Sequence, residues 1–232
     1  MELQDAPAAY IFKLWPKIEA NWKRIALGGG VIVVAALLIS FYSWQREQKE
    51  IYAGKALTQF MMTAPRNVSG SQQADSFLKI AADYPGTVAG QRAWLQGAAM
   101  LFVMGRYADA QTQFQKFLDA HPDNSFTAEA ALGLATSLDA QGKNDLAASA
   151  YQRVINSPSD ATAATSAKFA LAQIDERLGK FTDALNLYED ILRYNANGSM
   201  GSEAGLRAME LKMKLQSASP VPAPAAPSKP NP

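Results

Sequence analysis

The chain of 232 residues repeats itself with a period of 37, and this period constrains its fold more than any other feature. Glycine recurs at that spacing, and each glycine is followed after five, nine and twelve residues by alanine, an aromatic residue and an apolar residue. The recurring residues are Gly105, Ala110, Phe114 and Phe117; Gly142, Ala147, Tyr151 and Val154; and Gly179, Ala184, Tyr188 and Ile191. Such a period predicts a solenoid of stacked units.

Each unit is expected to be a pair of helices joined by a tight turn. Glycine suits the turn because it adopts a positive φ without steric cost after the first helix. The small alanine lets the two helices approach closely, and the aromatic ring fills the space beside the next unit. Pro122 and Pro158 are expected to end second helices. The predicted fold class is therefore all-α.

The unit from Gln91 to Asn124 resembles the tetratricopeptide repeat, through Trp94, Gly97, Ala98, Leu101, Gly105, Tyr107, Ala110, Phe114, Phe117 and Pro122. The next two units depart from that pattern, with Asn144 in place of tyrosine and Asp175 in place of an apolar residue. A degenerate unit lies upstream, where Phe77, Ile80 and Pro85 fall one period earlier. The resemblance implies four tetratricopeptide-like units over residues 54–201, the first of them degenerate.

Residues 202–216 are predicted to form a helix that caps the array, because a solenoid needs a polar outer end. We expect Leu206, Met209 and Leu211 to face inward in this helix. Residues 217–232 contain six prolines and are predicted to be an extended, disordered Pro/Ala-rich tail. This tail is either a spacer or ligand for a proline-binding partner, or a terminus without a function.

Residues 25–44 carry no charge and are long enough, at about 1.5 Å per residue, to cross a bilayer core of about 30 Å. Aromatic residues stand at both ends, as at the two membrane interfaces. We predict one transmembrane helix here, preceded by an N-terminal segment (1–24) with a short interfacial helix and followed by a linker helix (45–53). Pro16 is expected to kink or interrupt the interfacial helix. The alternatives for the apolar run are a buried core helix and a cleaved signal peptide, and the alternative for the first 24 residues is a mere flanking peptide.

The charges beside this run favour one orientation in the membrane. Four basic residues precede the run and three follow it closely: Lys13, Lys17, Lys23 and Arg24, then Arg46, Lys49 and Lys55. Positive charge concentrates on the cytoplasmic side of membrane proteins. This bias predicts a cytoplasmic N-terminus and a repeat domain on the other side of the membrane.

The composition excludes several classes of function. The chain has no cysteine, so it forms neither disulfides nor thiolate sites, and a single histidine, His121, disfavours a metal centre or a catalytic triad. From residue 45 onward, 18 basic residues balance 18 acidic ones, which gives no preference for nucleic acid. We find no phosphate-binding loop and no hydrolase or zinc motif. The prediction is a protein that is not an enzyme, with no cofactor, metal or small-molecule substrate.

In tetratricopeptide arrays the first helices line a concave groove, which implies a peptide-binding surface here. Its predicted members are Arg92, Leu95, Ala99 and Phe102; Glu129, Leu132, Thr136 and Asp139; and Phe169, Gln173, Glu176 and Arg177. The Lys/Asn/Arg clamp that some such domains use for a C-terminal carboxylate is absent. A mixed apolar and charged groove favours a helix or an extended segment with apolar anchors. The alternative is that these are ordinary surface residues of a spacer.

The combination of a short N-terminal segment, one span and degenerate repeats resembles the bacterial YfgM family, ancillary subunits of the Sec translocon. The match covers residues 12–57, including Leu14 to Arg24, and continues through the repeats. It implies an inner-membrane protein with periplasmic repeats that acts as an adaptor of the cell envelope. Its partners would be translocon subunits, periplasmic chaperones or exported clients. A structural or assembly component of another envelope complex, such as a cell-division or cell-wall coordinator, is the alternative.

Overall fold

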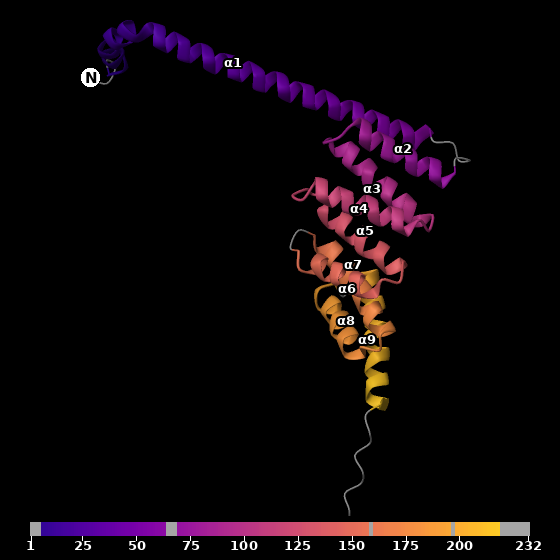
Figure 1. The fold of residues 1–232 in the computed structure, drawn as a ribbon. Helices are drawn as coiled ribbons and strands as arrows, with labels where there is room; N and C mark the ends of the chain where they lie inside the picture. The colour runs from indigo at the N-terminus through magenta and orange to yellow at the C-terminus, as the bar shows by residue number, and fades with distance from the viewer. Residues whose placement is uncertain (1–5, 64–68, 158–159, 196–197, 219–232) are drawn as a thin grey trace, which may run out of the picture.

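The computed structural model describes residues 6–63, 69–157, 160–195 and 198–218. Within these ranges the chain forms nine helices and no strand, which confirms the all-α prediction. The helices are α1 (Ala6–Thr63), α2 (Gly70–Asp83), α3 (Val88–Val103), α4 (Tyr107–Ala120), α5 (Thr127–Ala140), α6 (Asn144–Ile155), α7 (Ala161–Arg177), α8 (Phe181–Asn195) and α9 (Ser199–Ala218). Helices α2 to α9 stack into one elongated array, and α1 projects from its first end (Figure 1).

The turns between paired helices are built as the glycine period predicts. Gly105, Gly142 and Gly179 have φ angles of 77°, 73° and 75°. In the first turn the Arg106 N–H donates to the Leu101 carbonyl at 2.9 Å, and the Gly105 N–H donates to the Phe102 carbonyl at 2.9 Å. The same two bonds recur in the other two turns. This is the Schellman motif, so each glycine ends a first helix and starts the return of the chain.

The second helices supply the core at the predicted positions. Ala110, Ala147 and Ala184 are completely buried, so small side chains do occupy the closest approach of the paired helices. The aromatic and aliphatic residues that follow them are also buried: Phe114 and Phe117, Tyr151 and Val154, and Tyr188 and Ile191. Helix α4 ends at Ala120, two residues before Pro122, as expected. Pro158 lies outside the described residues.

Helix α1 joins four predicted segments into one. The interfacial helix, the apolar run, the linker helix and the first helix of the degenerate unit all lie within Ala6–Thr63. The helix continues through Pro16 instead of being interrupted there, because a proline removes one backbone hydrogen bond and the neighbouring turns keep theirs. The large apolar side chains from Leu27 to Trp44 are 56–74% exposed, which contradicts the alternative of a buried core helix.

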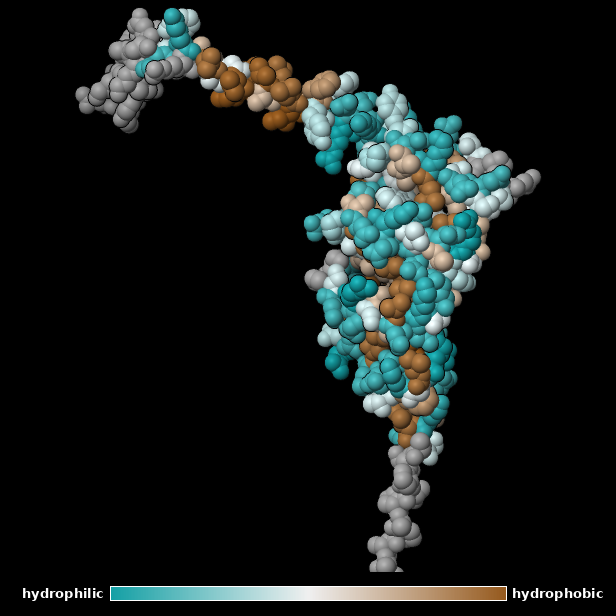
Figure 2. All heavy atoms as spheres, in the orientation of Figure 1, coloured by the Kyte–Doolittle hydropathy of each residue, from teal (hydrophilic) through white to brown (hydrophobic). Residues whose placement is uncertain are grey.

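By length and composition, one helical segment of the described chain, Asn21–Thr63, is able to cross a membrane. Figure 2 shows its apolar run as a hydrophobic stretch that stands clear of the array. The end of α1 that follows this run is fastened to the repeats. The Glu50 carboxylate accepts the Val88 N–H at 2.8 Å and the Ala89 N–H at 3.0 Å, which caps the positive end of α3. Nearby, the Phe60 ring packs edge-on against Phe77, with centroids 4.9 Å apart.

Helix α9 closes the array with a different face from the predicted one. Leu211 is buried as expected, but Leu206 and Met209 are exposed, so their predicted inward orientation is wrong. The buried side of α9 carries Ala204 and Ala208, because small residues allow α8 to approach closely. Ser217 and Ala218 still belong to this helix, and the rest of the predicted tail lies outside the described residues.

Candidate functional site

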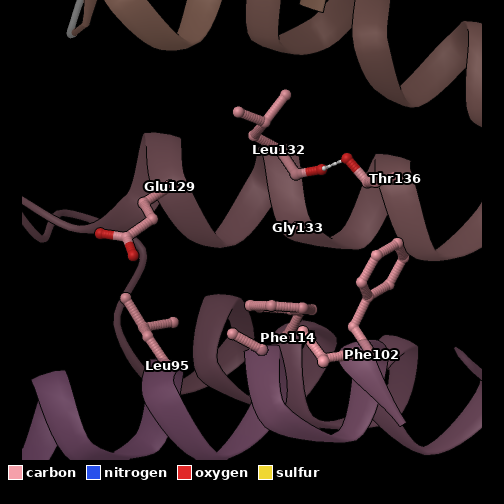
Figure 3. Close-up of a pocket in the computed structure, with 9 residues that line it drawn as sticks. Leu95, Phe102, Phe114, Glu129, Leu132, Gly133 and Thr136 are labelled. Carbon is pink, nitrogen blue, oxygen red and sulfur yellow. Dashed lines mark hydrogen bonds between the residues drawn. The ribbon is translucent and has the colours of Figure 1, made fainter. Parts of the chain in front are cut away.

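The first helices of neighbouring units enclose a pocket between α3 and α5 (Figure 3). Its volume is about 280 Å³. The lining is almost entirely apolar and consists of Leu95, Ala99, Phe102, Val103, Phe114, Glu129, Leu132, Gly133 and Thr136. Six of these nine residues were predicted from the sequence as groove positions.

The wall opposite α3 depends on a glycine. Phe114 reaches the pocket from α4, and its ring is buried beside Gly133 of α5. A Cβ atom at Gly133 would lie 2.4 Å from the Phe114 ring, so no larger residue fits without displacing that ring. The glycine therefore makes room for the Phe114 ring, which forms part of the pocket wall.

Two sides of the pocket are held by neighbouring groups. The Phe102 ring is half-buried and tilts against Tyr107, with centroids 5.1 Å apart. The Thr136 hydroxyl donates to the Leu132 carbonyl at 2.8 Å and accepts a hydrogen bond from the Tyr151 hydroxyl at 3.3 Å. Burial raises the pKa of Tyr151, which keeps that phenol protonated at neutral pH.

Glu129 provides the one carboxylate of the pocket. It lies in the first turn of α5, where the helix dipole favours a negative charge. Figure 3 shows its carboxylate at the end of the pocket nearest Leu95, away from Phe102. The pocket therefore offers an apolar interior with an anionic group at one end.

A second concavity, called here the polar concavity because its lining is more polar than that of the first, adjoins the pocket. Phe102, Thr136, Asp139 and Arg177 belong to its lining, together with residues of the turn after α5. The Arg177 guanidinium donates to the Asp139 carboxylate, an ion pair that links α7 to α5. The charges at these two groove positions therefore neutralise each other.

The groove positions on α7 are partly drawn into the core. Phe169 packs against the buried Tyr188 ring, with centroids 5.4 Å apart. The Tyr188 hydroxyl donates to the Glu176 carboxylate, and burial raises the Tyr188 pKa. Phe169 therefore supports α8, so replacing it would test folding more than binding.

The structure brings most, but not all, of the predicted groove residues together. Leu95, Ala99, Phe102, Glu129, Leu132 and Thr136 line the apolar pocket, and Asp139 and Arg177 line the polar concavity. Arg92, Phe169, Gln173 and Glu176 line neither of these two hollows. Val103, Phe114 and Gly133 also line the pocket and were not predicted; of these, Phe114 lies on a second helix, whereas the groove was expected to involve first helices. Phe114 was already marked by the period, but as a core residue.

No metal centre is formed by the side chains that the structure describes, since no group of three or more His, Asp or Glu residues is placed to hold an ion. Of the polar groups at the site, Thr136 bonds with Tyr151 and Asp139 pairs with Arg177, whereas Glu129 is exposed at the pocket. Chemically, the arrangement is suited to holding an apolar side chain beside a carboxylate.

Comparison with known proteins shows which family and which solved structures this chain resembles. The profile of the family described as "Tetratricopeptide repeat-like domain" matches residues 15–149, which is more than half of the chain. A search of curated proteins gave no match. A tetratricopeptide repeat protein from Parabacteroides merdae aligns with a TM-score of 0.55 at 11% identity, over 74% of this chain and 63% of that protein. The MamA protein aligns with a TM-score of 0.50 at 15% identity, over 77% of this chain and 100% of that one. At these identities the likeness shows the fold alone.

Proposed function

This chain belongs to the family of tetratricopeptide repeat-like domains, and from that membership we propose that it is a membrane-anchored adaptor that binds other proteins through the pocket between α3 and α5. Domains of this family bind proteins, and their fold is typically a non-catalytic scaffold. The observation that carries the proposal is an open apolar pocket on the groove side, built by residues from two successive units.

The size and lining of the pocket favour a side chain of a protein segment as its occupant. Its volume of about 280 Å³ is small, at the lower end of the range of about 300–1,000 Å³ that is typical of small-molecule sites. An apolar anchor on a helix or an extended segment would be enclosed by Leu95, Phe102 and Leu132. A basic residue of the same segment would meet Glu129. Buried apolar anchors of this kind contribute most of the affinity in peptide recognition.

The exposed apolar run of α1 supports a single membrane span at residues 25–44. With the charge bias described above, the N-terminus is cytoplasmic and the repeats lie on the opposite side. The resemblance to the YfgM family supports a place in the bacterial inner membrane with periplasmic repeats. On that basis the partners are translocon subunits, periplasmic chaperones or exported clients, and the protein is ancillary to the Sec translocon.

We favour this adaptor role over that of a permanent structural component of another envelope complex. An open pocket on the groove side suits a partner that binds and leaves, whereas a permanent assembly requires a broad surface that is buried at all times.

The proposal is tested by cross-linking and affinity purification of the full chain from solubilised membranes, followed by mass spectrometry. We expect Leu132→Glu to reduce recovery of translocon subunits and chaperones at least about tenfold, because a charge then occupies the apolar pocket. Leu146→Glu is the matched control, since Leu146 is exposed on the second helix α6 and lines neither hollow. Equal recovery with both variants, each with an unchanged melting temperature, would place partner binding outside the pocket.

A further inference from the structure

Helix α9 has the register of a first helix in a fifth unit. Residues one period apart, Ala93, Ala130, Ala167 and Ala204, are all completely buried. The residues one turn later on α5, α7 and α9 are also equivalent: Leu134, Leu171 and Ala208 are one period apart, and all three are buried. Helix α9 therefore packs on α8 as α7 packs on α6, and it continues the array instead of ending it with a new kind of contact.

The other face of α9 differs from its counterparts. Ala98, Ala135 and Ala172 occupy one position of α3, α5 and α7 and are completely buried in units that have both helices. The equivalent residue of α9 is Met209, which is 60% exposed. In the part of the chain that the structure describes, α9 is followed by no second helix, so this position is uncovered.

Met209 belongs to an apolar stripe on α9. Leu206, one turn before it, is 66% exposed, and Met213, one turn after it, is 53% exposed. Spacings of three and four residues place these side chains on one face. Two of the neighbouring charges are turned back onto the array: Lys212 pairs with Glu189 at 2.6 Å, and the Lys214 ammonium lies 3.8 Å from the centre of the Phe181 ring. Arg207 and Glu210, beside the stripe, pair with each other at 3.8 Å. Hydrophobic residues reach the surface at this end of the array in Figure 2.

We propose that this stripe, Leu206, Met209 and Met213, binds an amphipathic helix of a partner protein in the place that a second helix takes in the other units. The array itself shows what chemistry fits such a face. The second helices α4, α6 and α8 present a buried alanine, an aromatic residue four positions later and an aliphatic or aromatic residue three positions after that. Residues 219–232 do not suit this role, because proline removes the backbone N–H groups that a helix needs.

The methionine at position 209 limits which residues the partner helix can place opposite it. It is longer than the alanine it replaces, so the residue of the partner helix that faces Met209 has to be small. Its unbranched, flexible side chain adapts to different surfaces, which suits a docking site more than a fixed core. The partner is therefore an amphipathic helix with alanine or glycine at its centre and an aromatic residue one turn away.

The test uses the purified full chain in detergent and a fluorescein-labelled, hydrocarbon-stapled peptide of residues 107–120. This sequence covers α3 within the array, and the staple is needed because so short a helix is marginal in water. We expect saturable binding by fluorescence anisotropy that Met209→Glu weakens at least about tenfold. The same substitution at another exposed methionine, Met62→Glu, is the matched control and should leave Kd unchanged. The pocket variant Leu132→Glu should also leave it unchanged, which separates this surface from the proposed function.

Three results would overturn the proposal. Equal binding to Met209→Glu and wild type would place the peptide elsewhere. The absence of binding to the wild-type chain would reduce the stripe to an ordinary surface. If the peptide does not bind and sedimentation shows a dimer that Met209→Glu dissociates, the occupant is a second copy of this chain. A second peptide with Phe114→Glu tests whether the aromatic residue contributes to binding, and we expect it to bind more weakly than the first.

Discussion

The junction of α3 with α5 and the junction of α5 with α7 come from the same repeat, yet they present opposite chemistry on the groove side. At the first, Leu95, Phe102 and Leu132 surround an apolar pocket. At the second, an ion pair between Asp139 and Arg177 crosses the gap. The buried residues that define each unit are nearly the same in both places. A repeat therefore specifies how units stack and leaves the groove positions free to diverge.

The largest expected effect concerns a residue that belongs to both the stacking and the pocket. Phe114→Ala should lower the free energy of unfolding by about 3–5 kcal/mol, because it removes a buried ring beneath α5. Phe102→Ala serves as the control and should cost less, since that ring is only half-buried. Urea titrations followed by circular dichroism measure both. Equal losses would show that the groove wall is as much a part of the core as the stacking residues.

The next largest effect on stability concerns a buried position whose residue differs between the units. Asp175 is buried at the position that Leu101 and Leu138 occupy in the preceding units. Asp175→Leu should raise the free energy of unfolding by about 1–3 kcal/mol at neutral pH, because an apolar side chain replaces a buried carboxylate. Loss of the 3.8 Å contact between Lys180 and that carboxylate offsets part of the gain.

This gain should also depend on pH. Burial raises the pKa of Asp175 above its ordinary value of 3.8, with Lys180 opposing the shift. A group whose native pKa is raised stabilises the fold fully only below the pKa of the unfolded chain, and that contribution is lost as the pH rises through the native pKa. The advantage of Asp175→Leu should therefore grow from pH 3 to pH 7 in thermal unfolding. A constant advantage across that range would contradict the assignment.

The smallest effect on stability would come from making the second junction resemble the first. Replacing Asp139 and Arg177 together by leucine should change the free energy of unfolding by less than about 1 kcal/mol, because Arg177 is half exposed and such pairs contribute little. It should raise the fluorescence of an apolar dye, since it extends the apolar surface beyond Phe102. The neutral polar pair Asp139→Asn with Arg177→Gln is the control. An equal dye response from both would show that shape, and not charge, separates the two junctions.

The sequence predicted what depends on contacts within one unit. The glycine turns need only a positive φ, and the alanines need only a close neighbouring helix, so a 37-residue pattern is sufficient to find them. The pocket was predicted in part, because Phe114 enters it from α4 while the groove was expected to involve first helices alone. Leu132 and Phe169 share one register position, but only Leu132 lines the pocket. Contacts between units decide that difference, and one sequence does not reveal them.

The repeat pattern did not predict two further features of the structure. Glu50 caps α3 across 38 residues of sequence, and no local signal marks a carboxylate for such a distant helix end. Met209 and Leu206 were expected to face inward because apolar residues usually do. The structure buries Ala204, Ala208 and Leu211 against α8 instead, so small residues occupy most of the face that packs on the array.

The continuity of α1 has a mechanical consequence for the membrane span proposed above. Glu50 lies six positions, or about 9 Å of helix, after Trp44, and no break in the helix intervenes. With that span, the length of α1 sets the distance of the pocket from the bilayer. The helical phase of α1 sets the rotation of the array about the helix axis. Each residue inserted before Glu50 would swing the whole array by about 100°, so a partner in the membrane meets the groove from one direction.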